Sequence, residues 1–298
     1  MDQRLELLRS LAVENQTKMV LLVLDGLGGL PSESGMTELE KAITPNLDEM
    51  AAHGETGLLE IVDTGITPGS GPGHLALFGY DPLRYRIGRG ILETLGVGAE
   101  VEKGEVCARG NFCTWRDGDI IDDRRAGRIP TPESAEIVEV LSRSIKKIED
   151  VDVRFYSGME HRFAVVFSGE YLSEKVADAD PQQEGRPMKW ARAFDSSGEK
   201  TARIANALIR RVHEVLGDQP KANGCLLRGF SGVPDIPAMP DLYSMKAAAV
   251  ASYPMYRGLA RLVGMDVLEV GKTIKELFNT VVAFWDAYDY FYVHVKYT

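Results

Sequence analysis

The run of six apolar residues from Met19 to Leu24, followed by Asp25 and a glycine-rich turn, constrains the fold of this chain more than any other stretch. Apolar residues that do not alternate with polar ones are typical of a strand covered on both faces, as in a parallel sheet. The carboxylate of Asp25 then stands at the end of that strand, where open α/β sheets carry their ligand sites. The sequence therefore predicts a central strand with a candidate functional residue at its end. On spacing alone, Asp25 is explained equally well as the cap of the following loop or helix.

The pattern of elements predicts two kinds of architecture in one chain. Residues 1–108 and 223–298 alternate apolar strands with helices, which is typical of α/β folds. Residues 109–222 instead contain two hairpin-like strand pairs and two helices, and we interpret them as an inserted domain. The expected fold class is α/β, with a mixed, mostly parallel sheet interrupted by a smaller α+β insert.

Local signals place the individual elements. Thr44 as N-cap, Pro45 in the first turn and Gly54 as a stop predict a helix over 44–54, and the apolar residues at 57–63 predict a second strand. Asp117-Gly118 is a hairpin signal. Amphipathic periodicity predicts helices at 132–148 and 198–217. Apolar runs predict two strands around a glycine turn at 151–169, a strand followed by a turn at 225–232, and strands at 246–251 and 289–298.

Charge excludes one class of partner. The chain has a formal net charge of -10 and a pI near 5.1, whereas proteins that bind nucleic acid need a basic surface. A small anionic ligand would therefore depend on a local cluster of Arg and Lys. The three cysteines are odd in number and lack metal-type spacing, which favours free thiols in a reducing compartment. No apolar run reaches the roughly 20 residues that cross a bilayer, so we expect a cytoplasmic protein without membrane association.

Ser70 is the candidate nucleophile. It lies in Gly-Ser-Gly-Pro-Gly-His, residues 69–74, immediately before an apolar helical run. A hydroxyl at a helix N-terminus, beside backbone N–H groups, suits attack on an anion or its stabilisation. No Lys follows the glycines as in a Walker loop, and the spacing is not that of a Gly-x-Ser-x-Gly elbow. A serine N-cap explains the stretch without any chemistry, and His74 is expected to pack in the loop rather than bind a ligand.

Guanidinium groups concentrate in the predicted insert. The segment 122–128 contains Arg124, Arg125 and Arg128, and His161 and Arg162 follow at 160–162. Arginine binds phosphate and carboxylate bidentately, so on an acidic protein this cluster predicts a small anionic ligand. A solvated ion-pair network is the alternative for each arginine taken singly. The polar loop 177–187 has neither helical nor strand periodicity and is a further functional candidate.

Several of these motifs together resemble one family, the archaeal-type, cofactor-independent (2,3-bisphosphoglycerate-independent) phosphoglycerate mutases of the alkaline phosphatase superfamily. The motifs run in order through nearly the whole chain: V-L-D-G at 23–26, T-P-N-L-D at 44–48, G-S-G-P-G-H at 69–74, D-R-R-A-G-R at 123–128, H-R-F at 161–163, A-D-A-D-P-Q-Q-E-G-R-P at 177–187, L-L-R-G-F-S-G at 226–232 and K-A-A-A-V-A at 246–251.

The resemblance implies an alkaline phosphatase-like core with two divalent cations, manganese or zinc. It implies interconversion of 3-phosphoglycerate and 2-phosphoglycerate in glycolysis and gluconeogenesis, through a phosphoserine at Ser70. Asp25 and Ser70 match metal ligands. The expected substrate-binding residues, which the resemblance does not rank, are Arg124, Arg125, Arg128, His161 and Arg162. The partner is then a small-molecule phosphoglycerate, and a homo-oligomer is compatible with the family.

One departure from the family pattern concerns the metals. Family members continue beyond the strand at 289–298 into further Asp and His ligands, and Asp25 and Ser70 alone are too few to hold two cations. We therefore expect a fragment of a longer protein, with an incomplete metal site and no activity of its own. The alternatives are a phosphomonoesterase or phosphonate-processing relative on the same core, and a metal-free, non-catalytic scaffold.

Overall fold

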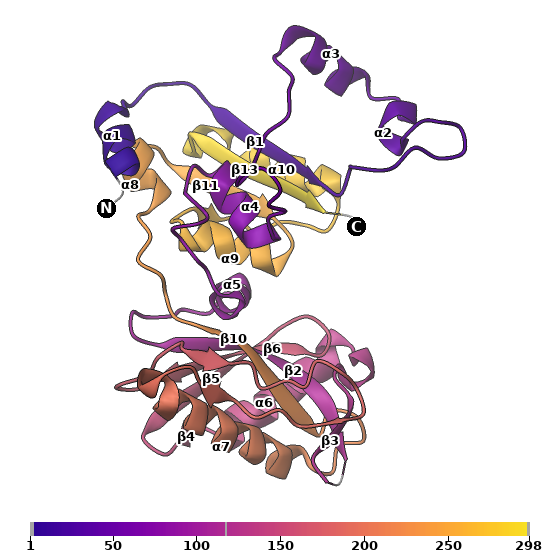
Figure 1. Ribbon diagram of the computed structural model, residues 1–298. Helices are drawn as coiled ribbons and strands as arrows, with labels where there is room; N and C mark the ends of the chain where they lie inside the picture. The colour runs from indigo at the N-terminus through magenta and orange to yellow at the C-terminus, as the bar shows by residue number, and fades with distance from the viewer. Residues whose placement is uncertain (1–2, 117, 297–298) are drawn as a thin grey trace. The chain divides into compact units, whose positions relative to one another are not determined.

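The computed structural model describes residues 3–116 and 118–296, and these form two compact units (Figure 1). The first unit comprises residues 1–84, 239–253 and 265–298, and the second comprises residues 85–238 and 254–264. The second unit is wider than the insert at 109–222 inferred from the sequence, because it also contains a helix before residue 109 and a strand after residue 222. The division of the chain at 108/109 and 222/223 stays a proposal.

A parallel four-stranded sheet forms the centre of the first unit. Its strand order is β1 (Met19–Asp25), β13 (Tyr290–Lys296), β11 (Ala247–Ala251) and β12 (Asp266–Val267). On one face, Leu277 and Val281 of α10 (Ile274–Ala283) pack with Phe291 and Val293 of β13. On the other face, α4 (Ser70–Leu77) is followed by Phe78, whose ring centroid lies 4.9 Å from that of Tyr292. Both faces of β13 are thus covered, as expected for a strand whose residues from Tyr290 to Val293 are all apolar or aromatic.

The prediction of a central strand at 19–24 is wrong in its position, although the strand itself is confirmed. β1 is an edge strand of this sheet, and within the described residues only β13 pairs with it. Met19 is 52% exposed and Val20 47%, so the strand is only partly covered. An apolar sequence indicates that a strand tends to be buried, but it does not determine whether the strand has one neighbouring strand or two. Gly26 ends the strand with φ of 89°, a left-handed conformation that glycine adopts without strain.

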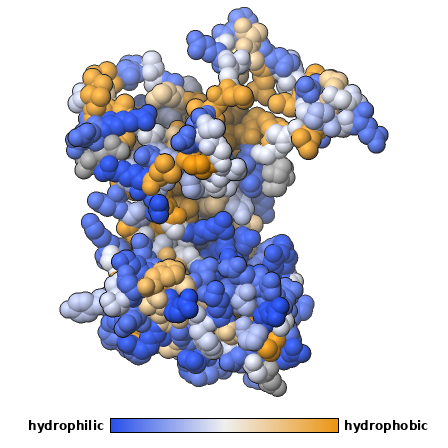
Figure 2. All heavy atoms as spheres, viewed as in Figure 1, coloured by the Kyte–Doolittle hydropathy of each residue, from blue (hydrophilic) through white to orange (hydrophobic). Residues whose placement is uncertain are grey.

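The remaining helices of the first unit differ in how well they are packed. α1 (Gln3–Leu11) contacts α8 (Met239–Tyr243) and buries Leu5. The predicted helix at 44–54 is confirmed as α3 (Pro45–His53), with Thr44 and Gly54 as caps, but neither α3 nor α2 (Glu38–Lys41) has a buried residue. Figure 2 shows apolar side chains exposed in this part of the molecule. The strand expected at 57–63 is wrong, since the segment forms coil and bends with no paired strand.

The second unit is built on an antiparallel sheet. In strand order it contains β4 (Lys147–Ile148), β5 (Val151–Ser157), β6 (Arg162–Ser168), β2 (Val106–Arg116), β3 (Ile120–Asp123) and β8 (Arg186–Pro187), while β10 (Gly224–Ser231) also pairs with β2. Outside this sheet, β7 (Val176–Ala177) pairs with β9 (Arg192–Ala193). Short 3₁₀ turns lie at Ala126–Arg128 and Ser196–Gly198 in this unit, and at Trp285–Ala287 in the first unit. The chain as a whole is therefore a mixed α/β protein with parallel and antiparallel sheets.

Helices cover both faces of the antiparallel sheet. α6 (Thr131–Ser144) and α7 (Glu199–Leu216) share one large apolar core with Val106, Ala108 and Phe112 of β2. α5 (Arg89–Gly96), which packs with α9 (Pro254–Leu262), covers the opposite face, where Ile91 contacts Cys107 and Val166. Because side chains alternate along a strand, Arg109 and Asn111 lie on the same face of β2 as Cys107. This face of the sheet carries the polar residues considered below.

The remaining sequence predictions in this unit are mostly confirmed. α7 matches the helix expected at 198–217, and β2 and β3 pair antiparallel as expected for a hairpin. Asp117 of the predicted Asp117-Gly118 turn lies outside the described residues. α6 ends at Ser144 rather than at residue 148, because Lys147 and Ile148 pair with β5. In neither unit does a described helix combine the length and apolar character that a membrane span requires.

Candidate functional site

Asp25 lies at the carboxyl end of β1, opposite Lys296 in the parallel register with β13. The Lys296 ammonium donates to Asp25 Oδ2 at 2.7 Å, and His294 Nε2 lies 3.6 Å from the same oxygen. The Asp25 side chain is 29% exposed. The structure thus places the predicted carboxylate at a sheet edge, as the sequence indicated, but beside an ammonium that the sequence did not pair with it.

Ser70 is the first residue of α4, after the N-cap Gly69, and it is exposed. His74 lies one turn later, is 7% exposed and donates from Nδ1 to the Ser70 carbonyl oxygen at 2.8 Å. Burial lowers the pKa of His74, which favours the neutral ring. The rings of His294 and Tyr292 lie 5.3 and 5.8 Å from the His74 ring. His74 is therefore a packing residue that supports the first turn of α4, in accordance with the sequence interpretation.

The residues around Asp25 do not by themselves fit a binuclear metal centre. Over 3–116 and 118–296, no three or more His, Cys, Asp or Glu side chains are grouped so that they could hold a metal ion. A zinc ion in a protein typically has three or four protein ligands, so a binuclear zinc centre would need more than the residues found here. At Asp25, the positive charge next to the carboxylate is supplied by Lys296.

The predicted substrate-binding residues lie together in the second unit. They line one pocket of about 160 Å³, and Arg109, Asn111 and Arg228 line it as well. Arg109 and Asn111 come from β2, Arg228 from β10, and the other residues from the turn after β3 and the start of β6, namely Arg124, Arg125, Arg128, His161 and Arg162. Strand pairing explains this convergence, because Arg109 is opposite Arg228 and Asn111 is opposite Arg162.

Carboxylates hold three of the pocket arginines. Arg124 donates from Nε and Nη2 to the two oxygens of Asp180, at 2.8 and 2.6 Å. Arg228 lies 3.3 Å from Asp180 and 3.4 Å from Asp178, and Arg128 lies 3.4 Å from Glu160. Burial opposes ionisation of Asp180, but the hydrogen bonds from Arg124 and Gln182 N outweigh it and lower its pKa. The same pairing raises the pKa of Arg124. These contacts fix the guanidinium groups before any ligand arrives.

Three other pocket residues carry buried polar atoms with no hydrogen-bond partner in the described part of the chain: Arg109 Nε, Asn111 Oδ1 and His161 Nδ1. Asn111 is 7% exposed and His161 3%. Burial, assisted by the charge of Arg162, lowers the pKa of His161 to about 4, so its imidazole is neutral at pH 7. Burial also lowers the pKa of Arg109. Since buried polar groups in native proteins are nearly always paired, these atoms mark a place for a ligand.

Sequence reasoning missed Arg109, Asn111 and Arg228. The signal that could have found the first two is their spacing, because polar residues at positions i and i+2 of an otherwise buried strand share one face. Arg228 gives a similar signal as a lone charge within the apolar start of β10. The loop 177–187, which the sequence did single out, supplies Asp178 and Asp180.

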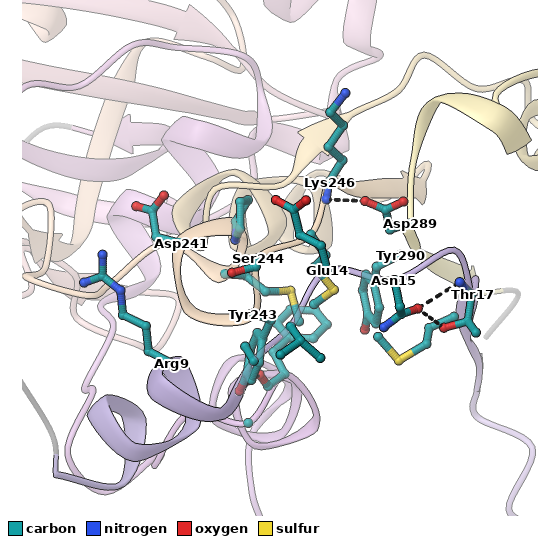
Figure 3. A pocket seen from close by; sticks show the side chains of 18 of the residues that line it. Arg9, Glu14, Asn15, Thr17, Asp241, Tyr243, Ser244, Lys246, Asp289 and Tyr290 are labelled. Atoms are coloured by element: carbon teal, nitrogen blue, oxygen red, sulfur yellow. Dashed lines mark hydrogen bonds between the residues drawn. The ribbon is translucent and has the colours of Figure 1, made fainter.

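A larger cavity, of about 1250 Å³, lies at the amino ends of the parallel strands of the first unit (Figure 3). It is lined by residues of α1, the segment 12–17 and α8, together with Met19, Lys246 and Tyr290. In Figure 3 the backbone N–H of Lys246 donates to Asp289, and Asn15 accepts from Thr17. None of the predicted site residues lines it. It is therefore separate from the strand end that holds Asp25.

Comparison with known proteins points to a single family. The sequence model described as "2,3-bisphosphoglycerate-independent phosphoglycerate mutase" matches residues 51–222. A Thermotoga neapolitana protein named as a probable 2,3-bisphosphoglycerate-independent phosphoglycerate mutase is 57% identical, over 97% of this chain and 71% of its own length. The similarly named Thermus thermophilus protein is 51% identical, over 98% and 73%.

Solved structures agree with the sequence comparison. The cofactor-independent phosphoglycerate mutase of Thermoplasma acidophilum superposes with a TM-score of 0.71 at 35% identity, over 94% of this chain and 78% of its own. A Pyrococcus horikoshii protein gives a TM-score of 0.76 at 26% identity, over 93% and 70%. The α/β architecture described above is thus also that of these relatives.

Proposed function

The chain belongs to the 2,3-bisphosphoglycerate-independent phosphoglycerate mutase family, and from this premise we propose that it binds phosphoglycerate in the arginine-lined pocket and exchanges the phosphoryl group through Ser70. The family is one of isomerases that interconvert 3-phosphoglycerate and 2-phosphoglycerate. The observation that carries the residue-level proposal is the meeting of Arg124, Arg125 and Arg128 with His161 and Arg162 in one pocket.

The charge of the pocket supports a multiply anionic ligand. The protein is acidic, with a net charge of -10, yet six arginines line a volume of about 160 Å³. Asp178, Asp180 and Glu160 offset part of that charge, and a remaining excess of guanidinium charge favours anions. Phosphoglycerate offers a phosphate and a carboxylate on three carbons, which suits a pocket smaller than those of drug-sized ligands.

Ser70 is the proposed phosphoryl acceptor. In this proposal, Ser70 Oγ attacks the phosphorus of 3-phosphoglycerate, the bond from phosphorus to the C3 oxygen breaks, and the serine proton ends on that oxygen. The C2 hydroxyl of the retained glycerate then attacks the phosphoserine, which forms 2-phosphoglycerate and returns a proton to Ser70. The position of Ser70 at the first turn of α4 supports this role, because the N-terminal end of a helix attracts phosphate.

Two divalent cations, manganese or zinc, belong to the proposal on the strength of the family resemblance. Asp25 and Ser70 are the ligands that this chain would contribute. The residues that the structure describes do not complete such a site, so no step above passes through a metal. Metal analysis of the purified chain tests this part directly, with fewer than two equivalents expected because the described residues do not complete the site.

The decisive assay follows both possible products. Adding 3-phosphoglycerate and manganese to the full-length protein and recording ³¹P NMR should show 2-phosphoglycerate, whereas glycerate and inorganic phosphate would contradict the mutase and favour a phosphomonoesterase. Ser70→Ala should lower the isomerisation rate by roughly 10³-fold or more without changing the melting temperature. Binding measured by calorimetry separates the two parts of the proposal: a chain that binds 3-phosphoglycerate without turnover retains the pocket assignment and matches the expectation of inactivity, and a chain that does not bind it contradicts the proposal.

A cytoplasmic location and a phosphoglycerate partner follow from the same proposal, since this conversion is a step of glycolysis and gluconeogenesis. Fractionation of cells that express the gene tests the location. A homo-oligomer, which the family resemblance allows, is tested by light scattering of the purified chain.

A further inference from the structure

Two residues of β2, Arg109 and Asn111, line the arginine pocket but belong to none of the motifs that carry the family resemblance. Arg109 and Asn111 are two positions apart on the strand and lie on the face covered by α5 rather than on the face that forms the large core. Gly110 between them leaves room for the Phe163 ring, which lies where a Cβ would be. The backbone thus holds both side chains in one direction, toward the pocket that they line.

Their polar atoms differ from those of the other pocket arginines. Arg124 and Arg228 make their ionic contacts with Asp180, which is fully buried. Arg109 Nε and Asn111 Oδ1 are buried but have no hydrogen-bond partner among the described residues. A buried polar atom without a partner destabilises a fold, and such atoms are rare unless they serve a ligand. Arg124 and Arg228 are therefore held by the protein, whereas Arg109 and Asn111 have capacity left for a ligand.

The two orphaned atoms are chemically complementary. Arg109 Nε–H is a donor and suits an anionic oxygen, whereas Asn111 Oδ1 is an acceptor and requires an N–H or O–H. In a pocket rich in guanidinium groups, an acceptor facing an anionic ligand contacts that ligand's hydroxyl group. We propose that Arg109 and Asn111 are ligand-binding residues that together recognise a phosphorylated hydroxy acid, with Arg109 bound to an anionic oxygen and Asn111 bound to the hydroxyl. This assignment rests on the proposed function and specifies the ligand class.

The test uses two probes that differ only in the hydroxyl. These are 3-phosphoglycerate and 3-phosphonooxypropanoate, which has the same phosphate and carboxylate but a hydrogen in place of the C2 hydroxyl. Calorimetry on the 298-residue chain should show 3-phosphoglycerate bound about tenfold more tightly, the usual effect of one hydrogen bond. Asn111→Leu should remove this preference, raising the Kd for 3-phosphoglycerate about tenfold and leaving the Kd of the analogue nearly unchanged.

Arg109→Met should weaken both probes by about tenfold to a hundredfold and keep the preference between them, since it removes a contact to an anionic oxygen. Arg116→Met is the matched control. Arg116 is on the same strand but exposed, paired with Asp122 and outside the pocket, so its removal should leave both Kd values unchanged. Asn111→Asp is a same-size variant that should weaken both anionic probes.

The melting temperature gives an independent test, because a ligand-binding role and a structural role predict changes of opposite sign. Removing a buried polar atom that has no partner should leave the melting temperature of Asn111→Leu and Arg109→Met unchanged or raise it by a few degrees. A fall of more than about 5 °C in both variants would assign them to the fold and overturn the proposal. Retention of the hydroxyl preference in Asn111→Leu would overturn it while leaving the mutase proposal intact. If the unmodified chain bound neither probe, both proposals would fail.

Discussion

Each unit of this chain holds a carboxylate against a cation, and the two pairs lie in different surroundings. Asp180 is fully buried and binds Arg124 through both oxygens, beside a pocket lined by residues from three strands and a turn. Asp25 is 29% exposed at the end of an edge strand, where Lys296 contacts one of its oxygens. A buried charge pair must be complete to be tolerated, whereas a pair that is partly exposed to solvent is screened and contributes less. The arginine pocket is therefore built into the fold of the second unit, whereas the pair at Asp25 contributes less to the stability of the first unit.

The largest expected effect is the loss of stability when the buried carboxylate of Asp180 is neutralised. Asp180→Asn removes the charge that compensates Arg124 and Arg228, so we expect the free energy of unfolding to fall by about 3 kcal/mol. Asp178→Asn is the matched control, because Asp178 lies on the same loop but is partly exposed and contacts only Arg228 among the pocket cations. Its expected cost is about 1 kcal/mol or less. Urea denaturation of both variants gives the comparison, and equal losses would show that burial does not distinguish the two carboxylates.

A second effect depends on pH and concerns His161. Its pKa in the folded protein is about 4, below the ordinary 6.5, because it is buried and faces Arg162, Arg128 and Arg125, and the opposing charge of Glu160 does not offset these effects. The unfolded chain therefore binds the proton more readily, and stability falls as pH decreases from about 6.5 toward 4. The loss attributable to His161 should reach about 2 kcal/mol at pH 5.

Comparison with His161→Asn isolates this contribution from the carboxylates that titrate in the same range. Urea denaturation at pH 7 and pH 5 should show a smaller loss in the variant, by about the same 2 kcal/mol. Parallel pH dependence of the variant and the unmodified chain would mean that His161 is solvated in the folded protein.

A smaller effect is expected at the sheet edge. Lys296→Met removes the ammonium from Asp25, and we expect the free energy of unfolding to change by about 1 kcal/mol or less, because both side chains are more than a quarter exposed. Adding salt should reduce the difference between the variant and the unmodified chain, since exposed charges are screened. A salt-independent loss near 3 kcal/mol would place this pair in the same class as Asp180 and Arg124.

The contrast between the units also explains what the sequence could predict. Fold class and most helices could be predicted, because periodicity is a local signal. That Arg124 and His161 belong to one site was expected from the motifs of the family resemblance. The edge position of β1 could not, since the pattern from Met19 to Leu24 reports apolar character and not the number of paired strands. Asp180 was visible as part of a polar loop, but its contact with Arg124, 56 residues away, depends on tertiary structure. Arg109 was missed because a single charged residue in a strand usually indicates a solvent-exposed position.

The smallest expected effect tests the least packed part of the first unit. Met50 of α3 is 69% exposed, and no residue of that helix is buried, whereas Leu141 of α6 in the second unit is fully buried. Met50→Ala should therefore change the free energy of unfolding by less than about 0.5 kcal/mol. Leu141→Ala, a matched loss of apolar side-chain volume in a helix, should cost about 3 kcal/mol.

Urea denaturation of this pair compares helix packing in the two units under one condition. A loss above about 1 kcal/mol in Met50→Ala would show that α3 is packed against apolar surface in solution, because removing an exposed side chain cannot cost that much. The exposed apolar residues around α3 would then be partly covered. Weak packing in the first unit would be restricted to α2 and the segment at 57–63.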